Sequence, residues 1–279
     1  MNDVAKDKVL VLGLDGLRHD RIDQVEMPNL RRLIAEGAYG TSLLPYAPPL
    51  ARTDSGPGWS SIATGVWPGR HGVVDNAFTA PDYAAWPDFL TRAARAGLAT
   101  YANIAWGDLV VHGTFGPEIG TLISHDGDAL GFAEADVLVA DHAAEFLATA
   151  AVDAAFVQFG GIDEAGHRHG PFSAPYVRQM EIVDTYVGRI LFALTRRPAG
   201  ESWTVVVVPD HGHRDEGNHG EDSPQERGVF VALHGPRVPA GTVLEAPALA
   251  DVAPTVLNRL GVRHTGLEGR DLLPVRVPG

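Results

Sequence analysis

The chain contains no cysteine among its 279 residues. Disulfides and thiolate metal ligands are therefore impossible, and a bound metal ion has to be held by histidine, aspartate or glutamate. The chain also lacks any run of about 18 apolar residues, so we expect no membrane-spanning helix. It has no cluster of lysine and arginine, and its net charge is −13. These features argue against a nucleic-acid polymer as a partner.

Apolar residues, in contrast, make up 45% of the chain, which is enough for a large core. The polar residues 1–8 lead into an apolar stretch that is too short for the core of a signal peptide. We therefore expect a cytoplasmic protein without membrane association. No internal repeat or linker interrupts the sequence, so residues 1–279 are expected to form one domain. The sequence does not indicate whether the chain forms oligomers.

Short apolar runs alternate with segments of helical periodicity along the chain. This alternation predicts an α/β fold with a mostly parallel central sheet and helices on both faces. In such sheets, ligands bind beyond the carboxyl ends of the strands. The glycine-rich residues 107–131 are expected to form an irregular loop that faces the substrate. The predicted strands are 8–13, 98–105, 155–159, 204–208 and 228–233, and the predicted helices are 28–36, 86–96, 133–150, 175–194 and 251–260.

Aspartates lie just beyond the ends of three of the predicted strands. A single aspartate there usually caps a turn, but Asp15, Asp163 and Asp210 would share one sheet edge, and histidines accompany two of them. His167 lies four residues after Asp163, so the two side chains meet if the segment makes a helical turn. The remaining histidines of this group are His211, directly after Asp210, and His219. Carboxylate and imidazole ligands without sulfur suit zinc best and manganese less well.

Small residues surround a group of hydroxyl side chains between residues 53 and 65. A loop of this kind that enters a helix places free N–H groups where an anion can bind. Spacing alone does not select the reactive hydroxyl among Thr53, Ser55, Ser60, Ser61 and Thr64. Among the other histidines, His71 is expected to shape a turn, and His169 and His213 are candidates for contacts with the ligand residues.

Taken in order, these motifs resemble the alkaline phosphatase superfamily, most closely its nucleotide pyrophosphatase/phosphodiesterase branch. The resemblance rests on Leu14-Asp15-Gly16-Leu17-Arg18, on Thr64-Gly65-x-x-Pro68-x-x-His71-Gly72 and on the Asp and His pairs above. It implies that Ser55 is the nucleophile and that Asn76 binds a phosphoryl oxygen. It also implies two divalent metal ions, zinc before manganese. One would be held by Asp163, His167 and His219, and the other by Asp15, Asp210 and His211.

The resemblance predicts hydrolysis of a small phosphate ester, a phosphodiester in the first place, through a phosphoserine on Ser55. Two aromatic positions of the nucleotide-cleaving enzymes are Gly56 and Gln158 here, which argues against a nucleotide substrate. Alternatives are a phosphomonoesterase, with Arg52 on a dianionic phosphate, and a phosphonate hydrolase. A sulfatase fits less well, because the Pro-x-Arg pattern of those enzymes is absent after Ser55. A non-catalytic metal-binding protein fits least, because every ligand position carries a usable residue type.

Overall fold

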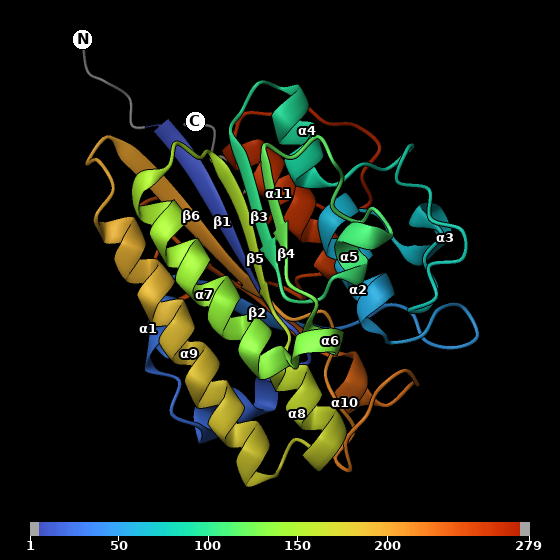
Figure 1. The fold of residues 1–279 in the computed structure, drawn as a ribbon. Helices are drawn as coiled ribbons and strands as arrows, with labels where there is room; N and C mark the ends of the chain where they lie inside the picture. The colour runs from blue at the N-terminus through green and yellow to red at the C-terminus, as the bar shows by residue number, and fades with distance from the viewer. Residues whose placement is uncertain (1–5, 274–279) are drawn as a thin grey trace.

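The computed structural model describes residues 6–273 of the chain. Its strands are β1 (Lys6–Leu14), β2 (Ala38–Leu43), β3 (Thr100–Ile104), β4 (Thr121–Ser124), β5 (Ala154–Phe159), β6 (Glu201–Val208), β7 (Gly228–His234) and β8 (Thr242–Val243). They form one sheet in the order β4-β3-β5-β1-β6-β7-β2-β8 (Figure 1). β1 lies between β5 and β6 and runs parallel to both, whereas β7 is antiparallel to its neighbours β6 and β2.

Helices cover both faces of this sheet, because alternate residues of the central strands point to opposite faces. Val9 and Val11 of β1 face α2 (Ser55–Thr64), α4 (Phe89–Arg95) and α11 (Val252–Arg259). Leu10, Leu12 and Leu14 face α1 (Pro28–Ala35), α7 (Phe132–Thr149) and α9 (Ala174–Thr195), and Figure 1 shows α7 and α9 side by side in front of the sheet. Burying each of these aliphatic side chains stabilises the fold by about 1.5–3 kcal/mol. The predicted mostly parallel sheet with helices on both faces is therefore confirmed.

The elements predicted from sequence are found within a few residues of their expected bounds. The strands that were missed, β2, β4 and β8, lie toward or at the edges of the sheet, and β2 and β4 are only partly buried. The prediction of an irregular loop at residues 107–131 was wrong in part, since this segment contains α5 (Asp108–Val111), β4 and α6 (Gly127–Leu130). The remaining helices are α3 (Pro68–His71), α8 (Gly161–His169), α10 (Pro224–Arg227) and two short 3-10 helices, His19–Gln24 and Leu249–Asp251.

The carboxyl ends of β5, β1 and β6 lie next to one another at the lower end of the sheet in Figure 1, where α8 follows β5. Loops that follow these three strands therefore converge on one region. Within residues 6–273, none of the helices has both the length and the apolar character needed to cross a lipid bilayer.

Candidate active site

Three aspartates mark the carboxyl edge of the three central strands. Asp15 comes directly after β1, Asp163 lies in the first turn of α8 after β5, and Asp210 comes two residues after β6. Asp15 and Asp210 are buried, with 3% and 0% of their surface exposed. Because β1 is flanked by β5 and β6, the sheet itself brings these carboxylates together.

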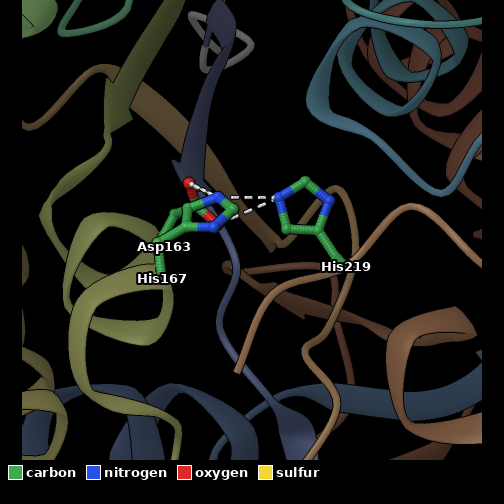
Figure 2. Close-up of side chains that lie close together, drawn as sticks. All are labelled: Asp163, His167 and His219. Carbon is green, nitrogen blue, oxygen red and sulfur yellow. Dashed lines mark hydrogen bonds and ion pairs between the residues drawn. The ribbon is translucent and has the colours of Figure 1, made fainter. Parts of the chain in front are cut away.

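The first group of candidate ligands consists of Asp163, His167 and His219 (Figure 2). Asp163 and His167 are one turn apart on α8, and Asp163 Oδ2 lies 3.2 Å from His167 Nε2. His219 reaches the same point from a distant loop, with its Nε2 3.0 Å from Nε2 of His167. Two ring nitrogens at this distance, beside a carboxylate, leave room for a shared cation.

The second group consists of Asp15, Asp210 and His211, all buried. His211 Nε2 lies 3.3 Å from Asp210 Oδ2 and 3.6 Å from Asp15 Oδ1. The ligand atoms of each group lie within 4.8 Å of one another. The structure thus brings together all six residues, and the two sets that the sequence resemblance implies are among the groups that could hold a metal ion. A third such group combines Asp163 and His211 with His213.

Each histidine of the two groups is oriented through its Nδ1. An oxygen lies close to this nitrogen in every case, so Nδ1 carries the proton and Nε2 directs its lone pair into the site, as in a metal-binding imidazole. The partners are Asn218 Oδ1 for His167 at 2.8 Å, the Gly212 carbonyl for His211 at 2.9 Å and the Thr53 carbonyl for His219 at 2.9 Å.

The charges of the site also fit a divalent cation. Burial and the neighbouring Asp210 raise the pKa of Asp15, and burial with Asp163 raises that of Asp210 to about 8. Burial also acts to raise the pKa of Asp163, but hydrogen bonds with His167 and His213 outweigh it and hold this pKa well below its usual range. Asp210 Oδ2 is buried without a hydrogen-bond partner among the described residues. Cations bound here would stabilise the three carboxylates as anions and give this oxygen a partner.

Ser55 is the first residue of α2 and is buried beside the second group. Its Oγ lies 3.1 Å from His211 Nε2 and 3.4 Å from Asp15 Oδ1. The other four hydroxyls of this window each donate to a backbone carbonyl: Thr53 to Glu221, Ser60 to Gly56, Ser61 to Pro57 and Thr64 to Ser60. The structure therefore separates Ser55 from the four competitors that sequence spacing left open.

Asn76 also lies at this site, beside the first turn of α2. Its Oδ1 accepts the N–H of Gly56 at 2.7 Å, and the residue lines the cavity that contains Ser55. The side-chain NH₂ of Asn76 is therefore the group left to bind a ligand.

Two buried residues that sequence reasoning did not single out as positioning groups hold Asp15. Trp59 Nε1 and Gln158 Nε2 both donate to Asp15 Oδ2, at 2.9 and 3.0 Å. A third residue, His213, was a candidate from the sequence, and its Nε2 lies 3.0 Å from Asp163 Oδ1. The backbone of Gly16 passes close to the ring of His213, and a Cβ at Gly16 would lie 2.7 Å from His213 Nε2. Position 16 therefore requires a glycine.

The other histidines singled out from the sequence lie outside the two groups. His71 is buried, its Nδ1 accepts the N–H of Val73, and its Nε2 lies 3.1 Å from Ser61 Oγ. Burial lowers its pKa to about 3, which fits a neutral, turn-shaping residue. His169 is exposed at the end of α8, and within residues 6–273 no hydrogen bond or ion pair joins it to the ligand residues.

Two aromatic side chains line the cavity beside Ser55. The two positions where the resemblance leads one to expect aromatic residues carry Gly56 and Gln158, but Trp106 and Phe132 line the same cavity from other elements. Trp106 follows β3 and Phe132 begins α7. Nothing in the local sequence marked these two rings, because only the fold brings residues 106 and 132 to Ser55.

Carboxylate and imidazole side chains thus converge at the carboxyl edge of this sheet in groups that could hold metal ions. Comparison with known proteins shows the family to which the chain belongs. Residues 9–226 match the family described as type I phosphodiesterase / nucleotide pyrophosphatase, and the chain belongs to this family.

Two curated relatives show how far the similarity extends. Ectonucleotide pyrophosphatase/phosphodiesterase family member 7 of Rattus norvegicus is 26% identical over 227 residues, which cover 74% of this chain and 49% of that protein. GPI ethanolamine phosphate transferase 2 of Aspergillus fumigatus is 29% identical over 145 residues, 47% of this chain and 19% of that protein. The chain thus spans half or less of the length of these relatives.

Solved structures show the same fold. Murine ectonucleotide pyrophosphatase / phosphodiesterase 5 superposes with a TM-score of 0.72 at 17% identity, covering 94% of this chain and 97% of that one. An inactive variant of that protein, in complex with AMP, gives the same TM-score.

Proposed function

We propose that this chain hydrolyses small phosphodiesters, with Ser55 as the nucleophile and two divalent metal ions, zinc in the first place, held by the two groups of ligands. The observation that carries the proposal is the position of Ser55 Oγ, 3.1 Å from His211 Nε2 and 3.4 Å from Asp15 Oδ1. Metal ions held by these residues would favour the alkoxide of a neighbouring hydroxyl and would offset charge on the phosphoryl oxygens.

Ser55 carries the phosphoryl group in the proposed reaction. Its Oγ gives up its proton to solvent and forms a bond to phosphorus while the bond to the leaving oxygen breaks, and that oxygen departs with the electron pair and takes a proton from water. A water oxygen then bonds to phosphorus and releases a proton to solvent, the bond to Oγ breaks with its electron pair on Oγ, and Oγ takes up a proton from water.

Two donors of the chain are available to a phosphoryl oxygen during these steps. One is the side-chain NH₂ of Asn76, whose oxygen is already bound to Gly56 N–H. The other is the backbone N–H of Ser55, because Gly58 N–H donates to the Asp54 carbonyl and Pro57 has no N–H. Donors fixed in this way stabilise developing negative charge without reorganisation.

A diester is proposed over a monoester because Arg52 is engaged elsewhere. Its Nε binds Asp54 Oδ2 at 2.9 Å, and 47% of its side chain is exposed. Arg52 therefore does not supply the additional positive charge that a dianionic phosphate requires. One relative is named a phosphodiesterase and another an ethanolamine phosphate transferase, which also supports a phosphodiester.

The test compares Ser55→Ala with Ser61→Ala, a matched loss of a hydroxyl six residues along α2. Both variants and the parent chain are loaded with zinc and assayed on bis-p-nitrophenyl phosphate, p-nitrophenyl phosphate and p-nitrophenyl phenylphosphonate. We expect Ser55→Ala to lose on the order of 10³-fold or more in kcat, with unchanged metal content, and Ser61→Ala to stay active. A kcat of Ser55→Ala equal to that of the parent chain would disprove the role of Ser55. If the parent chain hydrolyses the monoester or the phosphonate faster than the diester, the faster substrate replaces the phosphodiester in the proposal.

A further inference from the structure

One buried threonine connects the start of α2 with the loop that carries His219. Residues 209–223, which we call the ligand loop, lie within the described part of the chain and form neither helix nor strand, so regular structure does not fix the imidazole of His219. Thr53 makes three contacts with this loop. Its hydroxyl donates to the Glu221 carbonyl and accepts the N–H of Gly220, both at 2.9 Å. Its carbonyl oxygen lies 2.9 Å from Nδ1 of His219.

The hydroxyl of Thr53 bonds across the chain, whereas another buried threonine of this region bonds locally. Thr53 and Thr64 are both fully buried. Thr64 donates to the Ser60 carbonyl at 2.7 Å and accepts the N–H of Val66 at 3.4 Å, around the end of α2. The two bonds of the Thr53 hydroxyl span 167 and 168 residues of sequence. The Thr53 hydroxyl therefore holds two separate segments together, and the Thr64 hydroxyl completes the end of a helix.

The ligand loop is held from two sides at this point. Gly220 has a positive φ of 109°, and a Cβ there would lie 2.8 Å from Asp54 Oδ1, so the loop passes directly against the segment before α2. On the other side, the fully buried carboxylate of Glu226 accepts the N–H of Glu221 at 3.0 Å. Thr53 and Glu226 thus bind the two residues that directly follow the histidine.

We propose that Thr53 is a positioning residue, through which the segment that carries Ser55 orients His219 for metal binding. The inference rests on the ligand role that the proposed function gives to His219. A metal-binding imidazole is oriented by the partner of its other ring nitrogen, and such partners change metal affinity by about 10–100-fold. For His219 this partner is the Thr53 carbonyl at 2.9 Å, whereas Asp54 Oδ1 lies farther away, at 3.4 Å. The Thr53 hydroxyl fixes the backbone directly after the ring.

The first test removes the hydroxyl and keeps the size of the side chain. Thr53→Val lacks both bonds of the hydroxyl, Thr53→Ser retains them, and Thr64→Val is the matched control, a buried threonine whose bonds are local. The metal-free variants are titrated with zinc against a competing chelator. We expect the Kd of one zinc ion to rise about tenfold in Thr53→Val and to stay at the parent value in Thr53→Ser and Thr64→Val. The parent Kd in Thr53→Val, or an equal rise in Thr64→Val, would overturn the inference.

A smaller variant covers the case in which valine prevents folding. Thr53→Ala leaves room for a water molecule at the N–H of Gly220, and near-UV circular dichroism of the metal-free chain verifies its fold. We expect the Kd to rise about tenfold here too, because a water molecule does not tie the ligand loop to α2. A folded Thr53→Ala variant with the parent Kd would equally overturn the inference.

A double-mutant cycle locates the effect at His219. Thr53→Val is combined with His219→Ala and, separately, with His211→Ala, which removes a ligand of the second group. Thr53→Val should cause no further loss of zinc affinity beside His219→Ala, and should still raise Kd about tenfold beside His211→Ala. An equal loss in both combinations would show that Thr53 does not act through His219 and would contradict the inference.

Turnover separates this inference from the proposed function, because zinc affinity is measured without a substrate. If the parent chain hydrolyses no phosphate ester while Thr53→Val binds zinc about tenfold more weakly, the proposed function alone is rejected. If the parent chain hydrolyses bis-p-nitrophenyl phosphate and Thr53→Val keeps the parent Kd, the positioning role of Thr53 alone is rejected.

Discussion

Trp59 donates its indole N–H to Asp15 Oδ2 at 2.9 Å, across the interface between α2 and the end of β1. Gln158 donates to the same oxygen at 3.0 Å. The other oxygen, Oδ1, is left to face Ser55 Oγ at 3.4 Å and His211 Nε2 at 3.6 Å. Asp15 therefore has one oxygen bound inside the protein and one available to the site, so we expect it to bind a metal ion through Oδ1.

Replacing Trp59 by Phe removes the donor and keeps an aromatic ring in the core. We expect zinc affinity or activity to fall by about 10–100-fold, because Asp15 loses a group that orients it. Trp203→Phe is the matched control. Trp203 donates its indole N–H to Glu201 at 2.9 Å, and both residues lie at the amino end of β6, away from the ligands. Zinc titration against a competing chelator measures both variants. Equal losses of affinity in the two would show that the Trp59 bond has no special role.

A second prediction concerns Asp136 of α7, which binds the start of α8. Its Oδ1 accepts Gly160 N–H and its Oδ2 accepts Gly161 N–H, both at 2.9 Å, and burial raises its pKa to about 7. Asp136→Asn leaves one of these N–H groups opposite an amide NH₂. We expect the free energy of unfolding to fall by about 1–3 kcal/mol, measured by urea denaturation. Zinc affinity should also fall by about tenfold, because α8 carries Asp163 and His167.

The chain provides a matched control for this variant in Asp184 of α9. Asp184 is also buried and accepts the N–H groups of Asn29 and Leu30 at the start of α1, which carries none of the proposed ligands. Asp184→Asn should lose a similar amount of stability while its zinc affinity stays at the parent value. A normal zinc affinity in Asp136→Asn would contradict the role assigned to Asp136.

Metal removal gives a third prediction. Ions that bind only the folded chain stabilise it by mass action, by about 3 kcal/mol at a hundredfold excess over Kd. For a chain of this size we expect zinc to raise Tm by roughly 6–10 °C after dialysis against a chelator. Calcium, which prefers oxygen ligands, should produce a much smaller shift because three of the six ligands are imidazoles. Differential scanning fluorimetry with each ion provides the measurement, and equal shifts with both ions would contradict the assigned ligands.

A fourth prediction concerns pH and lies far from the site. Arg197 binds both carboxylate oxygens of Glu201, at 2.7 and 2.8 Å, and holds its pKa at about 2. Since this pKa is below the value of about 4.3 in the unfolded chain, its stabilisation is complete above that pH and is lost as the pH falls toward 2. Glu201→Gln should lower the free energy of unfolding by about 1–2 kcal/mol at pH 7 after allowance for solvent screening.

Urea denaturation between pH 7 and pH 3 tests this dependence. The difference in the free energy of unfolding between the parent chain and Glu201→Gln should become smaller as the pH approaches 3. Glu26→Gln, which removes a carboxylate that is 82% exposed beside Arg31, should show little difference at any pH. If the difference in the free energy of unfolding between the parent chain and Glu201→Gln stays constant down to pH 3, the lowered pKa of Glu201 is contradicted.

The central strands were predictable because their residues are apolar on both faces, as in β6, where Thr204 to Val208 are all buried. Strand β2 was missed because its residues Ala38–Leu43 alternate between buried and exposed without an apolar run. Helix α2 was not recognised along its whole length, since it includes Gly56, Pro57 and Gly58. It nevertheless forms a helix because every one of its residues is buried, and this packing outweighs weak local helix propensity.

The residue types and order of the chain by themselves determined the class of fold and the chemical kind of each candidate ligand, because these depend only on local composition and spacing. Tertiary structure decided which strands became neighbours. This pairing of strands brings Asp15, Asp163 and Asp210 together at one edge of the sheet. The bonds from Trp59 and Gln158 to Asp15, and the placement of Trp106, Asp128 and Phe132 beside Ser55, arose in the same way. Such contacts join distant segments, 143 residues apart for Gln158 and Asp15 and 156 for Ser55 and His211, and no local pattern specifies them.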